Sequence, residues 1–486
     1  MVLNYRMIGR VSGMILLILG IAMVPCVLIS LFYDETSTAV SFVYSIVVML
    51  SLGLAAQKIP ISPKKPTLRD AYIIVALCWI LGSMLGAVPY VVSGSIPNYI
   101  DALFESVSGL TATGATLLSD VESLPRGMLF WRSLTQWLGG MGILVFAIAI
   151  LPALGIGMQQ LMKAETPGPV LDKLTPKIAD TAKILYMIYI SMTLLEFSLL
   201  SIGGLSPYDA ILHTFGTVSS GGFSNYNDGI RHFGSIYIET VTFLFMIAVG
   251  MSFHVFFSIV KGKWNAFIED AEIRLYLIII GIAAIALSLN LFLSGTYDSV
   301  SDAIRFGFFQ AATSSSTTAY LSAEAYLWTD FSKMLLFALM FIGGCSASTA
   351  GAIKVIRFLV IAKLVQRGFL VRLHHRAILP IKINGRRLPS DTVNSITGFM
   401  ILYFVLFAAG ALLISLDNHG LLISATASAA ALGNGGCCFD LIDPNMNFSI
   451  FSAPSKILLS FLMLAGRLEL FTIILLLTPS FWNPDH

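Results

Sequence analysis

Long apolar runs constrain this sequence more than any other feature. A helix needs roughly 20 apolar residues to cross the hydrocarbon core of a membrane. Runs near or above that length occupy Met14–Phe32, Ala71–Val92, Leu129–Leu154, Phe243–Val260, Leu275–Leu293 and Ile457–Leu477. Only 12% of the 486 residues are charged, whereas soluble proteins carry about 25%. The runs are apolar on every side, unlike the alternating strands of a membrane barrel, and they predict an all-α integral membrane protein.

Basic side chains gather in polar gaps between these runs. Four gaps hold Lys58, Lys64, Lys65 and Arg69; Lys163, Lys173, Lys177 and Lys183; Lys261, Lys263 and Arg274; and Arg367, Arg372, Arg376, Lys382, Arg386 and Arg387. Cytoplasmic loops of membrane proteins are enriched in Lys and Arg, so we expect these gaps and both termini on the cytoplasmic side. Because topology is the usual cause of such charges, no nucleic-acid partner is expected.

The sequence offers little of the chemistry that enzymes or metalloproteins need. Its five cysteines, Cys26, Cys78, Cys345, Cys437 and Cys438, include no CxxC spacing and predict neither a disulfide framework nor a zinc site. We find no catalytic constellation, and therefore expect neither an enzyme nor a bound cofactor. The first apolar run lacks a convincing cleavage site and is expected to be a retained helix.

One pattern occurs four times: an apolar run, a short helix with start signals, a run of small and polar residues, and another apolar run. The small polar runs, which we name polar segments 1 to 4, are Thr111-Ala112-Thr113-Gly114, Ser219-Ser220-Gly221-Gly222, Ser316-Thr317-Thr318-Ala319 and Gly433-Asn434-Gly435-Gly436. Asp101 and Gly114 are 13 positions apart, as are Asp209 and Gly222. From Asp302 to Ala319 is 17 positions, which predicts about one additional helical turn in the third unit.

The short helices are predicted to enter the membrane and stop partway. Ser206 is a good N-cap, Pro207 suits the first helical position and Asp209 favours the positive end of a helix. About ten residues cannot cross the hydrocarbon core, and non-helical backbone at that depth is tolerated only where it lines a cavity or is buried in protein. Each short helix points its partially negative C-terminal end inward. Four such ends, followed by carbonyl oxygens that can replace an ion's water shell, predict a cation pathway, with small-residue helix packing as the alternative.

The chain resembles the Trk/Ktr/HKT family of potassium transporters over nearly its whole length, and most closely the bacterial TrkH/TrkG branch. The resemblance rests on Ser108–Ala115, Gln136–Gly142, Thr217–Ser224, Gly343–Thr349 and Gly466–Glu469. It implies two leading helices, at about 10–33 and 37–57, and four M1–P–M2 units around one K+ pore. The expected fold therefore has about ten transmembrane helices and four re-entrant pore helices.

The resemblance also implies boundaries, a substrate and partners. Residues 1–69 would form the leading hairpin, and residues 70–178, 179–270, 271–388 and 389–486 would form repeats 1 to 4. Potassium ion, as substrate, would bind the sixteen residues of the four polar segments. A homodimer with one pore per protomer, a cytoplasmic TrkA-type nucleotide-binding ring, surrounding lipid and the bacterial inner membrane are the implied setting.

A run of small residues in the third unit is predicted to form a gate. Gly343–Gly351 interrupts an otherwise continuous span from Phe331 to Leu364. The resemblance implies an intramembrane loop below the pore, with gating residues Gly343, Gly344, Ser346, Ser348, Thr349, Gly351 and Arg467. A flexible kink is the alternative for the loop. For Arg467 the alternative is a structural ion pair with Glu105 or Asp440, although we expect Glu105 to pair with Arg132.

Two positions depart from the family pattern. Ala319 stands where the family usually keeps glycine, and Cys437-Cys438 stands where Pro-Gly is common. These departures leave open a weakly selective or Na+-permeable cation transporter of the same fold. A secondary transporter with inverted repeats also uses broken helices, but it favours two halves of several helices over four short hairpin units.

Overall fold

The computed structural model describes residues 3–60, 67–142, 178–374, 379–436 and 447–483. Within these residues the protein is helical apart from connecting segments and one pair of two-residue strands. Six helices are long and apolar enough to cross a membrane, namely Tyr5–Phe32, Thr36–Gln57, Leu68–Val92, Thr181–Ile202, Ala271–Leu293 and Ser390–Asp417. A bent pair, Ile236–Gly250 with Phe253–Val260, makes a seventh if it is counted as one span.

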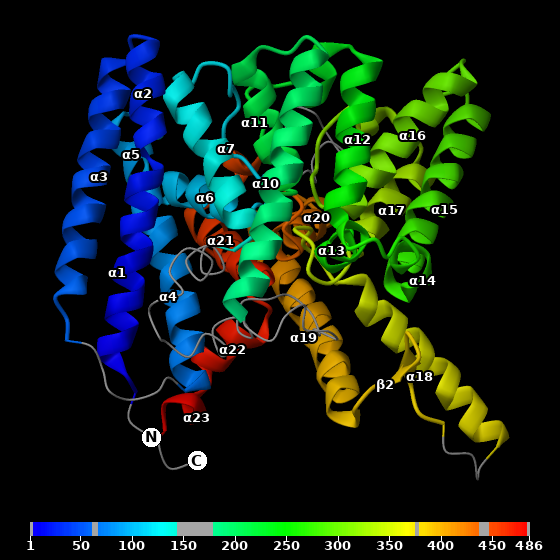
Figure 1. Cartoon of the computed structure of the whole chain (residues 1–486). Helices are drawn as coiled ribbons and strands as arrows, with labels where there is room; N and C mark the ends of the chain where they lie inside the picture. The colour runs from blue at the N-terminus through cyan, green and yellow to red at the C-terminus, as the bar shows by residue number, and fades with distance from the viewer. Residues whose placement is uncertain (1–2, 61–66, 143–177, 375–378, 437–446, 484–486) are drawn as a thin grey trace.

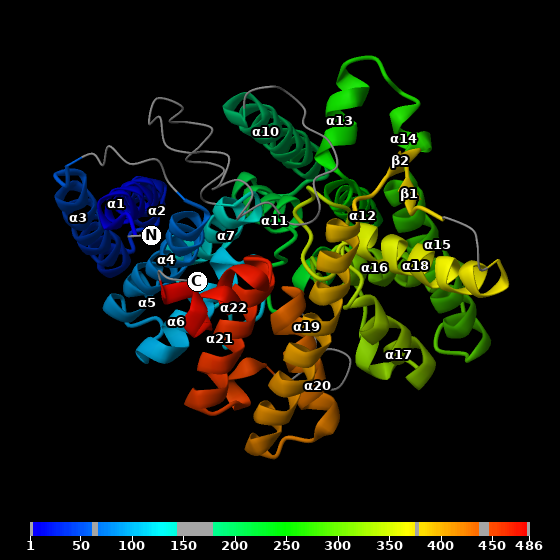
Figure 2. The same ribbon diagram turned by 90° about the horizontal axis from the view of Figure 1, so that it is seen from below.

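The leading helices pack closely on each other. They are α1 (Tyr5–Ala22), which continues into α2 (Val24–Phe32), and α3 (Thr36–Gln57). Small residues allow the close approach: a Cβ added to Gly13 would lie 2.3 Å from the Ala56 Cβ, and one added to Gly53 would lie 2.8 Å from the Gly13 carbonyl oxygen. This hairpin lies at one side of the molecule, outside the remaining helices (Figures 1 and 2).

Four helical units follow. The first comprises α4 (Leu68–Gly86), α5 (Val88–Val92), α6 (Tyr99–Leu110) and α7 (Arg126–Gly140). The second comprises α10 (Ile178–Ile202), α11 (Pro207–Val218), η2 (Gly229–Phe233), α12 (Ile236–Gly250), α13 (Phe253–Val260) and α14 (Ala266–Glu269). The third comprises α15 (Ala271–Leu293), α16 (Val300–Ser315), η3 (Ala325–Leu327), α17 (Asp330–Leu339) and α18 (Val355–Leu373), followed by β1 (Lys382–Ile383) and β2 (Arg386–Arg387). The fourth comprises α19 (Ser390–Ile414), η4 (Ser415–Asp417), α20 (Leu421–Gly433), η6 (Phe448–Ile450), α21 (Ala453–Arg467), α22 (Phe471–Leu477) and α23 (Pro479–Trp482).

The four units occupy successive sectors around a common centre, as Figure 2 shows in the view from below. In each unit a short helix, α6, α11, α16 or α20, follows a longer one, α4, α10, α15 or α19. This all-α membrane architecture, a leading hairpin plus four hairpin units, is the fold class that the sequence predicts.

The second helices of the second, third and fourth units are interrupted, whereas the predicted run Leu129–Leu154 of the first unit extends beyond the described residues. Two apolar runs that the sequence suggests as continuous spans are each two helices: Phe243–Val260 is divided between α12 and α13, bent by 97°, and Ile457–Leu477 is divided between α21 and α22. At the first break the freed backbone groups bond elsewhere. The Gly250 carbonyl accepts a hydrogen bond from the Cys345 N–H at 2.7 Å, and the Phe253 N–H donates to the Ala347 carbonyl at 3.2 Å. A helix that breaks within the membrane needs such replacement hydrogen bonds for the backbone groups that lose their helical partners.

The two chain ends lie on one side of the molecule. Figure 1 shows both termini at the bottom, the side toward which the end of α18 and the β1–β2 hairpin also extend. The hairpin packs through Ile381, Ile383 and Leu388 against apolar residues of α18 and α19. The polar turn of this hairpin is therefore held against the helical body.

Candidate functional site

Two of the four short helices, α6 and α11, begin at side-chain caps. The Asp209 N–H donates to Ser206 Oγ at 3.1 Å, and Pro207 is the first residue of α11, which confirms the predicted start. Asn98 caps α6 by accepting from the Ile100 N–H at 2.9 Å. The third short helix, α16, has 16 residues against 12 in α6 and in α11, so the additional turn predicted from sequence spacing is present.

Polar segments 1 to 3 follow these helices and touch in succession. A Cβ added to Gly114 would lie 2.0 Å from the Gly221 carbonyl oxygen, and one added to Gly222 would lie 1.7 Å from the Thr318 carbonyl oxygen. Both glycines also have positive φ, 80° and 73°, a conformation that glycine alone adopts without steric cost. A neighbouring carbonyl thus fills the space that a side chain would need.

Segment 4 closes the ring. A Cβ added to Gly436 would lie 2.5 Å from the Thr113 carbonyl oxygen, whereas one added to Gly435 would lie 3.5 Å from the nearest atom, Thr317 Cβ. Asn434 Nδ2 also donates to Thr113 Oγ1 at 3.0 Å. The contacts therefore run from segment 1 to 2, 2 to 3, 3 to 4 and 4 to 1, so the four predicted segments surround one axis.

Left-handed backbone recurs within the segments. Positive φ angles occur at Ala112, Gly114, Ser220, Gly222, Thr317, Ala319 and Asn434. Alternating right- and left-handed residues point successive peptide carbonyls toward the same side of the backbone. Rows of carbonyl oxygens presented in this manner replace the water shell of K+ in channels. Ala319 adopts a φ of 62°, at a cost of about 1–2 kcal/mol for a residue with a Cβ.

Buried polar side chains brace the ring. Gln136, fully buried, donates from Nε2 to the Gly221 carbonyl at 2.8 Å and accepts from the Phe223 N–H at 3.0 Å. Tyr320 donates its hydroxyl to the His213 carbonyl at 3.0 Å, which links segment 3 to the second short helix. Gln136 belongs to one of the sequence stretches that carry the family resemblance.

A buried ion pair supports the first unit. Arg132 NH2 lies 2.8 Å from Glu105 Oε1, and the two side chains are 2% and 0% exposed. Glu105 also accepts from the Leu117 N–H at 3.2 Å, and Arg132 NH1 donates to the Ser224 carbonyl at 3.3 Å. The expected Glu105–Arg132 pair is confirmed, and it connects the backbone that follows segments 1 and 2.

A cavity of about 600 Å³ lies against one end of the ring. Its lining includes Gly114, Gly222, Ala319 and Gly436, the last residue of each polar segment. Asp228 and Glu324 also line it, and both pair with Arg231, at 2.8 Å and 2.7 Å.

An exposed carboxylate lies next to this cavity. Asp120 is adjacent in sequence to two residues of the cavity lining, Ser119 and Val121. A hydrogen bond from Asn227, another lining residue, is the main cause that lowers the pKa of the Asp120 carboxyl. This carboxylate therefore keeps its negative charge at mildly acidic pH, close to where a cation would enter.

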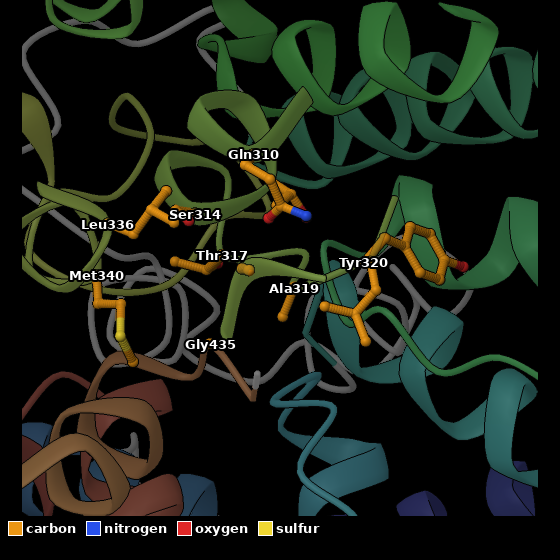
Figure 3. A pocket seen from close by; sticks show the side chains of 11 residues that line it. Gln310, Ser314, Thr317, Ala319, Tyr320, Leu336, Met340 and Gly435 are labelled. Atoms are coloured by element: carbon orange, nitrogen blue, oxygen red, sulfur yellow. The ribbon is translucent and has the colours of Figure 1, made fainter. Parts of the chain in front are cut away.

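A second, much smaller cavity of about 30 Å³ lies behind segment 3. Figure 3 shows Gln310, Ser314, Thr317 and Ala319 around it, with Gly435 at its edge. Gln310 Nε2 and Thr313 Oγ1, from the same lining, are buried without a hydrogen-bond partner among the described residues. Segment 3 is thus less tightly supported at the joint with segment 4.

The residues 343–351, which we call the intramembrane loop, lie at the opposite end of the ring from the large cavity. The Gly351 N–H donates to Thr317 Oγ1 at 2.7 Å, and Thr349 Oγ1 lies 2.9 Å from Ser220 Oγ. The Ala352 N–H, next to the loop, donates to the Gly433 carbonyl at 2.7 Å. The loop therefore bonds to segments 2, 3 and 4 near the C-terminal ends of their short helices.

The remaining predicted loop residues lie close to the helix break. A Cβ added to Gly343 would lie 1.9 Å from the Gly351 carbonyl oxygen, and one added to Gly344 would lie 2.6 Å from the Gly250 carbonyl oxygen. Ser348 Oγ donates to the Cys345 carbonyl at 2.5 Å. The loop is a compact, hydrogen-bonded structure with no room for side chains at these glycines.

Arg467 joins this loop to the first unit. It donates from NH1 to the Thr349 carbonyl at 3.1 Å and from NH2 to the Gly139 carbonyl at 2.7 Å. The alternative pairing with Glu105 is wrong, because Glu105 is bound to Arg132. Asp440, the other suggested partner, lies outside the described residues, as do Cys437 and Cys438.

Three charged residues near the loop were not singled out as site residues from the sequence. Lys354, buried, donates to the Ser348 and Ala350 carbonyls. Arg357 pairs with Glu469, and Glu272 accepts from the loop backbone. Two of these residues could have been identified from the sequence. Lys354 and Arg357 follow the run of small residues within an apolar region, where charged residues usually have a function.

Comparison with known proteins gives full-length matches. The model of the TrkH family, described as a cation transport protein, matches residues 38–483. The Trk system potassium uptake protein TrkH of Salmonella typhimurium is 35% identical, over 99% of this chain and all of the relative. TrkG of Escherichia coli, with the same description, is 32% identical over 99% of each chain. The crystal structure of the potassium transporter TrkH from Vibrio parahaemolyticus superposes with a TM-score of 0.89 at 33% identity, covering 99% of this chain and 100% of that one.

Proposed function

Because the chain belongs to the TrkH family of cation transport proteins, we propose that it is the K+-translocating membrane subunit of a Trk-type potassium uptake system. The relatives named above are potassium uptake proteins or a potassium transporter. The single observation that carries the proposal is the closed ring of polar segments, in which each segment touches the next through backbone.

The proposed conduction pathway runs through this ring. K+ enters from the large cavity, exchanges water for carbonyl and hydroxyl oxygens of residues 111–114, 219–222, 316–319 and 433–436, and leaves toward the intramembrane loop. The short helices aim their partially negative ends at the same region. Backbone carbonyl oxygens carry only partial negative charges. They therefore bind K+ weakly enough to release it, which conduction requires.

The intramembrane loop is the proposed gate. This proposal is supported by the loop's hydrogen bonds to Thr317 and Ser220, at the end of the ring away from the large cavity, and by the bonds of Arg467 to the loop and to the first unit. A passing ion would have to displace the loop. We propose that a cytoplasmic nucleotide-binding partner of the TrkA type controls this step, since the relatives are named as parts of a system.

The proposed setting is the bacterial inner membrane, with lipid around a homodimer and both termini in the cytoplasm. Two observations support this orientation. The termini lie on the side of the β1–β2 hairpin (Figure 1), and that hairpin carries Lys382, Arg386 and Arg387, as expected of a cytoplasmic loop. The repeat boundaries at residues 70, 179, 271 and 389 are proposed on the same fourfold pattern.

A weakly selective or Na+-permeable transporter is the second candidate. The observation that favours it is Ala319, which holds a left-handed conformation at the last position of its segment, where the other three segments have glycine, next to the looser joint with segment 4. A strained residue beside a small cavity gives the ring more freedom to contract around a smaller ion.

Reversal potentials separate the two candidates. The purified protein is reconstituted into planar bilayers, and currents are recorded under opposed K+ and Na+ gradients. A reversal potential near the K+ equilibrium value supports the K+ proposal. Equal permeability supports the second candidate, and the absence of any cation current with the loop removed would reject both.

A further inference from the structure

Glu272 binds the intramembrane loop and the start of α18, the helix that follows the loop. One of its oxygens, Oε1, accepts from the Ser346 N–H at 2.6 Å, from Ser346 Oγ at 3.1 Å and from the Ile356 N–H at 3.1 Å. Ser346 lies near the start of the loop, and Ile356 lies just after it, at the beginning of α18. A single carboxylate thus ties two points ten positions apart in the chain.

The loop needs such external bonds because its backbone is strained. Ala347 and Ala352 have φ angles of 56° and 51°, and each left-handed non-glycine residue costs about 1–3 kcal/mol. Residues in such conformations persist only where surrounding contacts fix them. Glu272 Oε1 supplies an acceptor for both Ser346 and Ile356.

Glu272 is itself fixed in place from the opposite side. It lies in the first turn of α15, where Asp270 caps the helix by accepting from the Glu272 N–H at 2.8 Å. Asn384, in the turn of the β1–β2 hairpin, donates from Nδ2 to Asp270 Oδ2 at 3.1 Å and accepts from the Ala271 N–H at 3.0 Å. The start of α15 is therefore held between the hairpin turn and the loop.

The other bonds that hold the loop differ in kind. Lys354 is part of the segment that follows the loop and donates to the Ser348 and Ala350 carbonyls and to Ser348 Oγ, so it moves with the loop. Arg467 reaches the loop from the fourth unit at Thr349. Glu272, from the first turn of α15, joins Ser346 in the loop to Ile356 at the start of α18.

We propose that Glu272 is a positioning residue that keeps the intramembrane loop closed across the ring by joining Ser346 of the loop to Ile356 of α18. The inference rests on the proposed gating function, and it assigns to the first turn of α15 a role in setting how often the gate opens. Selection between K+ and Na+ belongs to the polar segments and is independent of this contact.

The test measures K+ flux into liposomes that contain the protein without any cytoplasmic partner. Glu272→Ala removes the acceptor and should raise basal flux about tenfold, the usual scale of a coupling between two sites. Glu272→Gln keeps the size and one carbonyl oxygen but loses the charge, so it should give an intermediate rise. Glu269→Ala is the matched control, because Glu269 is an exposed carboxylate three positions earlier. The K+/Na+ permeability ratio should be unchanged in all three variants.

A variant with Ala347–Thr349 deleted makes the outcomes distinguishable. If the deletion raises flux and the Glu272 variants do not, the assignment of Glu272 is overturned and the gate survives. If the deletion also leaves flux at the wild-type level, the gate proposal fails and this inference fails with it. A changed K+/Na+ ratio in Glu272→Gln would likewise overturn the assignment, because it would indicate general damage to the ring. If Glu272→Ala does not fold, Glu272→Gln alone decides.

Discussion

Replacing Gly222 by alanine is the sharpest test of the ring. The new Cβ would lie 1.7 Å from the Thr318 carbonyl oxygen, whereas real Cβ atoms essentially never approach within 3.0 Å of such atoms. Segments 2 and 3 would have to separate by more than about 1 Å, a shift comparable to the differences in ion fit on which selectivity depends. The positive φ at this position adds about 1–2 kcal/mol of backbone strain.

The expected result is a loss of selectivity without loss of the fold. A strain of one to two kcal/mol corresponds to a factor of about 5–30 in an equilibrium, so the K+/Na+ permeability ratio from bilayer reversal potentials should fall at least about fivefold. Gly435→Ala is the matched control, since its nearest neighbour would be 3.5 Å away and its φ is not among the positive ones. That variant should stay within about twofold of wild type.

Two results would refute this reasoning. One is a Gly222→Ala protein that elutes as wild type from size-exclusion chromatography and keeps the wild-type permeability ratio. The other is a Gly435→Ala protein that loses selectivity as strongly as Gly222→Ala, because the space around the glycine would then not be what matters.

Three further changes test other parts of the structure. Ala319→Gly removes a left-handed residue with a Cβ and should raise the stability by up to about 1 kcal/mol, measured as a higher Tm in detergent; a lower Tm contradicts the strain argument. Arg132→Ala leaves the Glu105 charge buried and alone and should cost about 3–5 kcal/mol, with much of the loss recovered when Glu105 is also replaced by glutamine; no recovery in the double variant would mean that the pair is not the cause. Arg467→Ala removes the bonds to the Thr349 carbonyl and should raise basal K+ flux in liposomes several-fold, and flux at or below the wild-type level would argue against a gating role.

Local signals in the sequence were sufficient to predict the hairpin units. The cap at Ser206 with Pro207 behind it marked the start of α11, and the interval from Asp302 to Ala319 carried the additional turn of α16. Both features depend on a few neighbouring residues. They are visible in a single sequence because capping and helical rise are local physics.

Breaks in the second helices were harder to predict. The run Phe243–Val260 is mostly apolar, and the partners that stabilise its break at Gly250 come from the intramembrane loop, nearly a hundred positions away. Hydrophobicity measures transfer into lipid and carries no information on where a backbone carbonyl finds its donor. The role of Glu272 was missed for the same reason, because it depends on Ser346 and Ile356.

The β1–β2 hairpin had a sequence signal that was not used. Asn384-Gly385 is the dipeptide most typical of a two-residue hairpin turn, and it forms the turn between β1 and β2. The order in which the polar segments contact one another had no such signal. It follows from the packing of four units around an axis, which no local pattern encodes.

Having all four units on one polypeptide has a consequence for how this pore can change. In a channel assembled from four identical subunits, any substitution in the ion pathway appears four times, so an alanine as the last residue of a polar segment would be repeated in every subunit. Here it appears once, as Ala319, beside the joint where Gly435 leaves the most space. A single-chain pore can therefore accumulate substitutions in one unit at a time. Whether each substitution is tolerated depends on the neighbouring segment that it contacts.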